Sequence, residues 1–182
     1  MLEPGRKLPQ IATIDFIVGV FRIFIDLQLH YGSAMSNPIL DAYTAGIAEV
    51  AELLTYSPAD LTKTPADGGW SAAQVLGHLA DAEISIALRI RMMFTTDDYT
   101  FLSWDEDLFA NLNPNRNAIA SVGVVTALRR ANLDLINGLV EDQLNRSGFR
   151  QDGSAITVID YIDRMNNHTR DHLAQALKAL AG

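Results

Sequence analysis

The chain has 182 residues, 48% of them hydrophobic, and its 14 Lys and Arg against 22 Asp and Glu give a formal net charge of −8. This composition is typical of an ordinary globular domain with one sizeable core and excludes a disordered chain. The negative charge argues against binding to nucleic acid or to an anionic membrane. Because the chain has no cysteine, a disulfide framework, a thiolate metal site and a thiol nucleophile are excluded.

The first 36 residues are interpreted as an N-terminal extension. Their apolar stretch IDFIVGVFRIFIDLQL is interrupted by Asp15, Arg22 and Asp26 on one side, whereas a membrane-spanning helix needs about 20 residues with few charges. We therefore expect no membrane span, but an amphipathic helix that packs on the bundle, binds a partner or lies in a membrane interface. Alternatively, the natural start is Met35. We expect residues 1–34 to be dispensable for the fold, and without a clear export signal we expect a cytoplasmic location.

From residue 37 to residue 182 the apolar residues repeat with helical spacing, and no run alternates for long enough to predict a strand. The first helix is predicted from about Pro38 to Tyr56. The second begins after Ser71, an N-cap with Gln74 in the capping-box position, and runs to about Thr95.

The next connection, about residues 96–115, holds one short helix and is far longer than a tight helix hairpin needs. A helix of ~25 residues is ~37 Å long, so a connection of this length can cross a bundle from end to end. The third helix is predicted from about Ala118 to Val140 and the last from about Thr157 to Ala181. We therefore predict an all-α four-helix bundle with a long crossover between helices 2 and 3.

Two of the four histidines, His168 and His172, stand four residues apart at the border of the apolar stripe of the last helix. Side chains at i and i+4 lie one turn apart on one face, so both imidazoles can bind one ion. His78 lies ~10 Å into the second helix, a depth that antiparallel packing would bring level with residue 172. These positions predict a site for one divalent ion, with histidines that only pack in the core as the alternative.

Other chemistry-bearing residues have weaker patterns. Arg89 and Arg91 lie about three turns beyond His78, where a guanidinium fork can hold a substrate carboxylate, with structural pairing as the alternative. The acidic run of residues 105–107 is interpreted as a solvated face, and capping of the short helix or approach to the metal are the alternatives. Trp70 and Trp104 are predicted to serve packing.

Six motifs taken in order, WSAAQVLGHLADAE, RIRMMF, WDEDLFA, ALRRANLDLI, RSGFRQDGSAITV and NHTRDHLAQ, resemble the DinB-like superfamily, which includes YfiT-type metal-dependent hydrolases. The resemblance implies an up-down-down-up four-helix bundle over residues 37–182, with a divalent metal held by His78, His168 and His172. The chain departs from the family pattern at Phe149, Thr169 and Asp171, where family members often have His, Asp and His.

Three neutral histidines leave positions open on a metal, as in catalytic sites. An open position can activate water for hydrolysis or bind a thiolate. Because the resemblance includes thiol-dependent enzymes, we expect transfer of a low-molecular-weight thiol to a small electrophile, with a hydrolase or a non-catalytic metal-binding bundle as alternatives. Zn or Ni is the expected metal, and the expected partners are a small-molecule substrate and a second copy in a homodimer.

Overall fold

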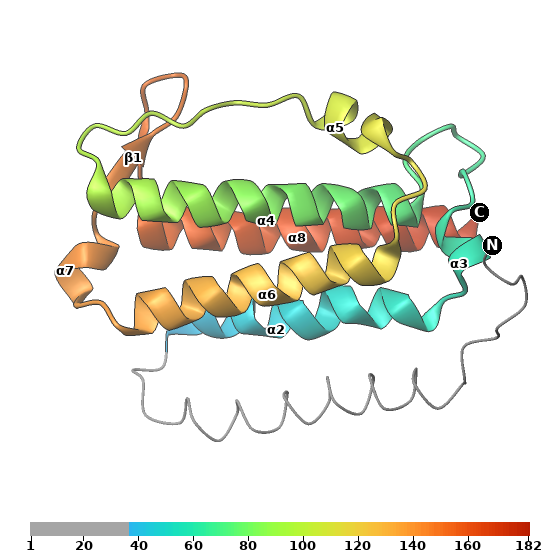
Figure 1. Cartoon of the computed structure of the whole chain (residues 1–182), viewed down its shortest axis with the longest axis horizontal. Helices are drawn as coiled ribbons and strands as arrows, with labels where there is room; N and C mark the ends of the chain where they lie inside the picture. Colours follow the sequence, from blue (N-terminus) through green and yellow to red (C-terminus); the bar gives the residue numbers. More distant parts are fainter. Residues whose placement is uncertain (1–36) are drawn as a thin grey trace, which may run out of the picture. The chain divides into compact units, whose positions relative to one another are not determined.

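The computed structural model describes residues 37–182, and the N-terminal extension with its predicted amphipathic helix lies outside the described residues. The described part contains four long helices: α2 (Pro38–Glu52), α4 (Ala72–Thr95), α6 (Ala118–Asn137) and α8 (Val158–Ala181). In Figure 1, α2 and α8 run in one direction while α4 and α6 run in the other. Helices α2 and α4 each pack against both α6 and α8. The predicted up-down-down-up four-helix bundle is confirmed.

Side-chain caps determine where the long helices begin. Ser71 and Gln74 form the predicted capping box at α4, with the Gln74 N–H 3.2 Å from Ser71 Oγ and the Ser71 N–H 3.0 Å from Gln74 Oε1. Thr157 caps α8 by accepting the N–H of Asp160 at 3.2 Å, and an asparagine caps α2 and α6. Removing such a cap typically costs about 1 kcal/mol, so these residues define the helix starts locally.

Two helices end earlier than predicted. The first was expected to reach Tyr56, but α2 ends at Glu52 and a 3-10 turn, η1 (Leu53–Thr55), follows; such turns often tighten helix ends. Helix α6 ends at Asn137 rather than Val140, because Gly138 follows and glycine is a poor helix former. Short helices α3 (Pro58–Leu61) and α7 (Glu141–Leu144) lie beyond these ends.

The prediction that the chain contains no strand is wrong. Strands β1 (Ser147–Phe149) and β2 (Ala155–Thr157) form an antiparallel hairpin just before α8. The crossover pairs with β1 as well: the Phe101 N–H donates to Phe149 O and the Phe149 N–H donates to Tyr99 O, both at 2.8 Å. Strands of three residues are too short to show an alternating pattern, and the partner across the sheet is distant in sequence.

The predicted crossover joins α4 to α6 and contains the short helix α5 (Glu106–Leu112), capped by Asp105. Figure 1 shows it running along the whole length of α4, from one end of the bundle to the other. Because α4 and α6 run in the same direction, their connection has to return across the bundle. None of the helices between residues 37 and 182 is both long and apolar enough to span a membrane.

The bundle interior contains two apolar clusters with a charged pair between them. On α4, Val75 and Leu79 belong to one cluster and Ile86 and Ile90 to the other. Glu83 lies between these positions, fully buried, and its Oε1 is 2.6 Å from Nε of the equally buried Arg129 on α6. Burial of a charge is costly unless the charge is paired and hydrogen-bonded, and here it is.

Candidate metal centre

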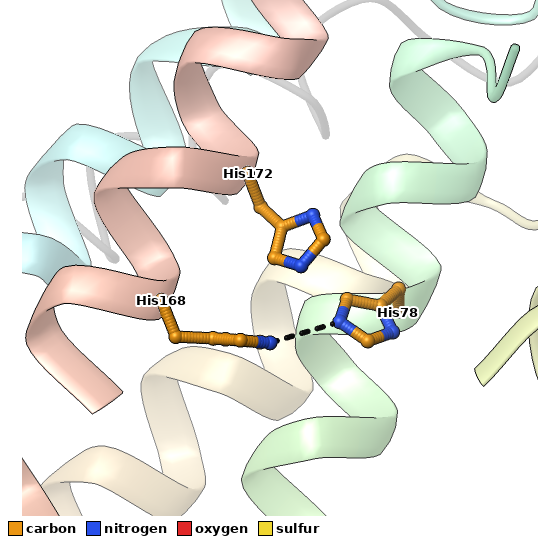
Figure 2. A group of neighbouring side chains, drawn as sticks. All are labelled: His78, His168 and His172. Atoms are coloured by element: carbon orange, nitrogen blue, oxygen red, sulfur yellow. Dashed lines mark hydrogen bonds between the residues drawn. The ribbon is translucent and has the colours of Figure 1, made fainter. Parts of the chain in front are cut away.

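The structure brings the three predicted histidines together between two antiparallel helices. Figure 2 shows His78 on α4 facing His168 and His172 on α8. His78 Nε2 lies 3.1 Å from His168 Nε2, and one ligand nitrogen from each of the three rings lies within 4.8 Å of the other two. His78 therefore lies level with His172, as its distance from the start of α4 predicted.

Burial keeps the imidazoles of His78 and His168 neutral. His78 is 1% exposed, and burial together with the neighbouring imidazoles of His172 and His168 lowers its pKa to about 3. Burial and the charges of nearby groups, His172 foremost, also lower the pKa of His168 to about 4. Both rings are therefore uncharged at neutral pH, which is the form that can ligate a metal.

Gln175 orients the third imidazole. Its Oε1 lies 2.8 Å from His172 Nδ1, so the ring carries its proton on Nδ1 and presents the lone pair of Nε2. Metal-ligating histidines almost always donate their second N–H to such a partner. Gln175 was missed from the sequence, although its i+3 spacing from His172 on the same helix face could have indicated it.

The residues present suit a divalent cation. Neutral imidazoles are ligands for Zn, Ni, Cu and Fe. The His78 and His168 rings face each other with their Nε2 atoms in a partly buried position. Among the described residues, His78 Nδ1 is buried without a hydrogen-bond partner, so this ring is not held by a second polar group as His172 is. His78, His168 and His172 would each offer one ring nitrogen to such an ion.

Two tryptophans and a glutamate border the cluster. The Trp70 ring stacks on His172 at 6.0 Å between centroids and lies 5.1 Å from His78, while Trp104 lies 5.6 Å from His78. The packing role predicted for both tryptophans thus takes place against the histidines themselves. Of the acidic run, Asp105 caps α5, whereas Glu106 Oε2 approaches His78 Nε2 to 3.9 Å with the side chain 60% exposed.

A pocket of about 300 Å³ opens beside the cluster, and His78 and His168 are part of its lining. Arg89, predicted for substrate binding, is part of its lining. Arg91 is not: its Nη1 donates to Ala87 O and to Asn132 Oδ1, both at 2.8 Å, on the side of α6. The structure therefore brings one of the two predicted arginines to the histidines and places the other elsewhere.

Residues 42–176 match the model of a protein family described as the DinB superfamily. The chain belongs to the DinB superfamily. Among DinB-like relatives, "Putative metal-dependent hydrolase OB0413" of Oceanobacillus iheyensis is 25% identical over 144 residues, which are 78% of this chain and 82% of that protein. "Putative metal-dependent hydrolase YfiT" of Bacillus subtilis is 26% identical over 125 residues, covering 67% of this chain and 68% of YfiT.

Solved structures share the DinB-type bundle. YfiT from Bacillus subtilis, described as a probable metal-dependent hydrolase with an unusual four-helix bundle topology, superimposes with a TM-score of 0.72 at 20% identity over 81% of this chain and 89% of YfiT. A mycothiol-dependent maleylpyruvate isomerase superimposes with a TM-score of 0.59 at 15% identity, over 78% of this chain and 59% of that protein. At these identities the superpositions establish the fold.

Proposed function

We propose that this chain is a metal-dependent enzyme whose ion, Zn or Ni, is held by His78, His168 and His172. The observation that carries the proposal is the meeting of three imidazoles, two of them neutral at neutral pH because of burial, beside a pocket that His78 and His168 line. Curated relatives whose names describe metal-dependent hydrolases support it. Three protein ligands leave coordination positions open for a small molecule, as catalytic sites require.

A bound divalent ion supplies Lewis acidity and lowers the pKa of a coordinated water or thiol. The residues of the chain do the rest. Gln175 holds the His172 ring in the tautomer that ligates, and Trp70 and Trp104 shield the His78 ring from solvent. Glu106, with its carboxylate 3.9 Å from His78 Nε2, accepts the proton that a thiol or water gives up.

Transfer of a low-molecular-weight thiol to a small electrophile is the reaction we favour. The chain has no cysteine, so a thiol has to arrive with a small molecule, and one structural neighbour is named for its dependence on mycothiol. The sulfur forms a bond to the electrophilic carbon, the electron pair of the broken bond leaves with the displaced group, and the thiol proton passes to Glu106. Arg89, in the pocket wall, binds a carboxylate of the thiol or electrophile.

Hydrolysis is the second candidate, because the curated relatives are named as hydrolases. In that reaction water replaces the thiol and Glu106 accepts the proton from water.

A homodimer and a cytoplasmic location stay predictions. Sedimentation of the full chain tests whether it forms a homodimer.

One assay distinguishes a thiol transferase, a hydrolase and a protein without enzymatic activity. Metal-loaded protein without a His-tag is incubated with a panel of thiols and monochlorobimane, and in parallel with ester substrates. Thiol-specific conjugation that is lost in His172→Ala supports the transferase, and ester cleavage without thiol supports the hydrolase. His30→Ala removes an imidazole that we do not assign to the site and serves as the matched control. No metal-dependent rate with any pair, despite full metal occupancy, would overturn the enzyme proposal.

A further inference from the structure

The pocket beside the histidines gathers positive charge in a chain whose net charge is −8. Arg89 from α4, Arg150 from the end of β1 and Arg164 from α8 all line it. Among residues 37–182, Glu106, next to His78, is the only carboxylate that lines this pocket. Three elements distant in sequence thus bring guanidinium groups to a single cavity, against the sign of the whole molecule.

None of these three arginines has a carboxylate within ion-pair distance among residues 37–182. Other arginines of the bundle do, at N–O distances of 2.6 to 2.7 Å: Arg116 with Asp81, Arg129 with Glu83, and Arg146 with Asp97. The carboxylate closest in sequence to Arg150, that of Asp152, instead accepts the N–H and the hydroxyl of Ser154. The pocket arginines therefore keep their charge available for a ligand.

Neutral groups hold Arg89 in place. Its Nη1 donates to the Tyr161 hydroxyl at 3.0 Å, its Nη2 donates to Leu102 O, and its guanidinium lies 4.9 Å from the centre of the Phe101 ring. A carbonyl, a hydroxyl and a ring face orient the guanidinium without neutralising it. Arg89 is thus a fixed positive charge in the pocket wall, already positioned before a ligand binds.

Arg150 and Arg164 have more freedom. The half-buried Arg150 has one long contact, Nη1 to Ser154 Oγ at 3.4 Å. The exposed Arg164 lies one helical turn before His168 on the same face of α8, near enough for its charge to lower the pKa of that imidazole. It makes no hydrogen bond or ion pair within the part of the chain that the structure describes. Both side chains are therefore free to close on an anion.

The hairpin that carries Arg150 is fixed over the pocket by close packing. A Cβ on Gly148 would lie 2.6 Å from Phe101 Cε1 and 3.0 Å from Met93 Cγ, so only glycine lets β1 approach this closely. The Gln151 side chain donates to Phe101 O and adds a second anchor. Arg150 follows Gly148 by two residues, so its position in the wall depends on this contact.

We propose that the three arginines lining this pocket form a subsite for a ligand with two carboxylate groups, which holds the ligand beside the histidines. Guanidinium groups bind carboxylates through paired, charge-assisted hydrogen bonds, and three such forks present more donors than the roughly four acceptor sites of one carboxylate. The inference rests on the proposed function in one respect, namely that the bound dicarboxylate is the thiol or its acceptor. Binding of the dianion itself depends on the arginines and not on the metal.

The test is calorimetric titration of the metal-free full chain with succinate, glutarate and acetate at low ionic strength. Succinate or glutarate is expected to bind at least about tenfold more tightly than acetate. Arg150→Gln and Arg164→Gln should each weaken dicarboxylate binding about tenfold, which corresponds to about 1.4 kcal/mol. Arg170→Gln removes the same charge from α8 outside the pocket lining and should leave the affinity unchanged. Circular dichroism checks that each variant keeps its fold.

Equal affinity for acetate and the dicarboxylates, or unchanged binding in an Arg150→Gln/Arg164→Gln double variant, would overturn the proposal. These two side chains are partly or fully exposed, so the result does not depend on Arg89, whose loss could disturb Tyr161. Metal per chain is measured on the same samples. Dicarboxylate binding without metal uptake would overturn only the proposal that the chain is a metal-dependent enzyme. Metal-dependent turnover without dicarboxylate binding would overturn only the proposal of a dicarboxylate subsite.

Discussion

Two polar clusters involve α4 and α8, one joining all four long helices and one confined to these two, and they differ in how their hydrogen-bonding groups are satisfied. In the first, Glu83 accepts from Arg129 at 2.6 Å and from the Tyr43 hydroxyl at 2.7 Å, and Arg129 also donates to the Thr169 hydroxyl at 2.6 Å. In the second, His78 and His168 meet at 3.1 Å and His78 Nδ1 has no described partner.

The clusters are adjacent: Thr169 of the first directly follows His168 of the second. Their difference shows how a polar group that holds the bundle together can be told from one that is available for chemistry. The charged pair is buried and mutually satisfied, and neither of its members lines the pocket beside the histidines. The imidazoles and the neighbouring arginines keep lone pairs or charges that the described residues do not satisfy.

Breaking the closed cluster should have the largest effect. Arg129→Met leaves the Glu83 carboxylate buried without its partner, and loss of one member of a buried ion pair typically costs about 3–5 kcal/mol. Urea unfolding followed by circular dichroism measures this loss. Lys178→Met, which breaks the exposed Lys178–Asp67 pair, is the matched control and should cost far less, because surface ion pairs contribute little to stability. Similar losses in the two variants would refute the assignment of the first cluster to stability.

Removing the metal should affect the open cluster alone. At a free metal concentration 100 times the Kd, binding stabilises the folded chain by about 2.7 kcal/mol. A chelator should therefore lower the Tm of the wild type, and the His78→Ala, His168→Ala and His172→Ala variants should show no such response. Metal analysis gives the second readout. Near-stoichiometric metal in all three alanine variants would show that the ion binds elsewhere.

Acidification should weaken the metal-free fold through the open cluster. Burial holds the pKa of His78 at about 3 and that of His168 at about 4, whereas unfolded histidines have a pKa near 6.5. The unfolded chain thus binds more protons as pH falls below 6.5, and the free energy of unfolding decreases, by on the order of 2 kcal/mol at pH 5 for each of the two imidazoles.

The control for this prediction is His78→Ala, in which the decrease should be smaller. Burial raises the pKa of Glu83, which acts in the opposite direction, so only the difference between wild type and variant isolates the imidazole. Parallel pH profiles for the two proteins would contradict the prediction.

The smallest effect is expected from Gln175→Ala. Without Gln175 Oε1, the His172 tautomer is no longer fixed, and loss of such an outer partner typically lowers metal affinity 10–100-fold. Competition with a chromogenic chelator measures the affinity, and the unfolding of the metal-free protein should be unchanged. Lys178→Ala, three residues further along α8, provides the control. An unaltered Kd would mean that the imidazole needs no second partner.

The parts of this architecture that the sequence predicted correctly depend on local signals. Ser71 with Gln74 and Thr157 with Asp160 lie within one helical turn of each other, so the starts of α4 and α8 could be read directly. The meeting of the three histidines was also predictable, because the i+4 spacing places two of them on one helix face and helix depth constrains the third.

The parts that were missed depend on contacts between distant segments. The β1–β2 hairpin is defined by pairing with the crossover at Phe101, and nothing in three residues of strand indicates such a partner. Arg164 reaches the pocket from the same helix face as His168, which the spacing allowed, but Arg150 reaches it only through the hairpin. For the same reason, the sequence does not distinguish Arg89 from Arg91. Their distant partners do: Arg89 donates to the Tyr161 hydroxyl on α8 and Arg91 to Asn132 Oδ1 on α6.

The parallel orientation of α4 and α6 has a consequence for how such a protein diversifies. It obliges the chain to send one connection across the bundle, and that connection carries Trp104 and Glu106 to the histidines (Figure 1). The three histidines belong to long helices, whereas Trp104 and Glu106 belong to a connecting segment of the kind that tolerates insertions. Substitutions and insertions in the crossover and the hairpin can therefore change the surroundings of the histidines, while the four long helices and the three histidines stay the same.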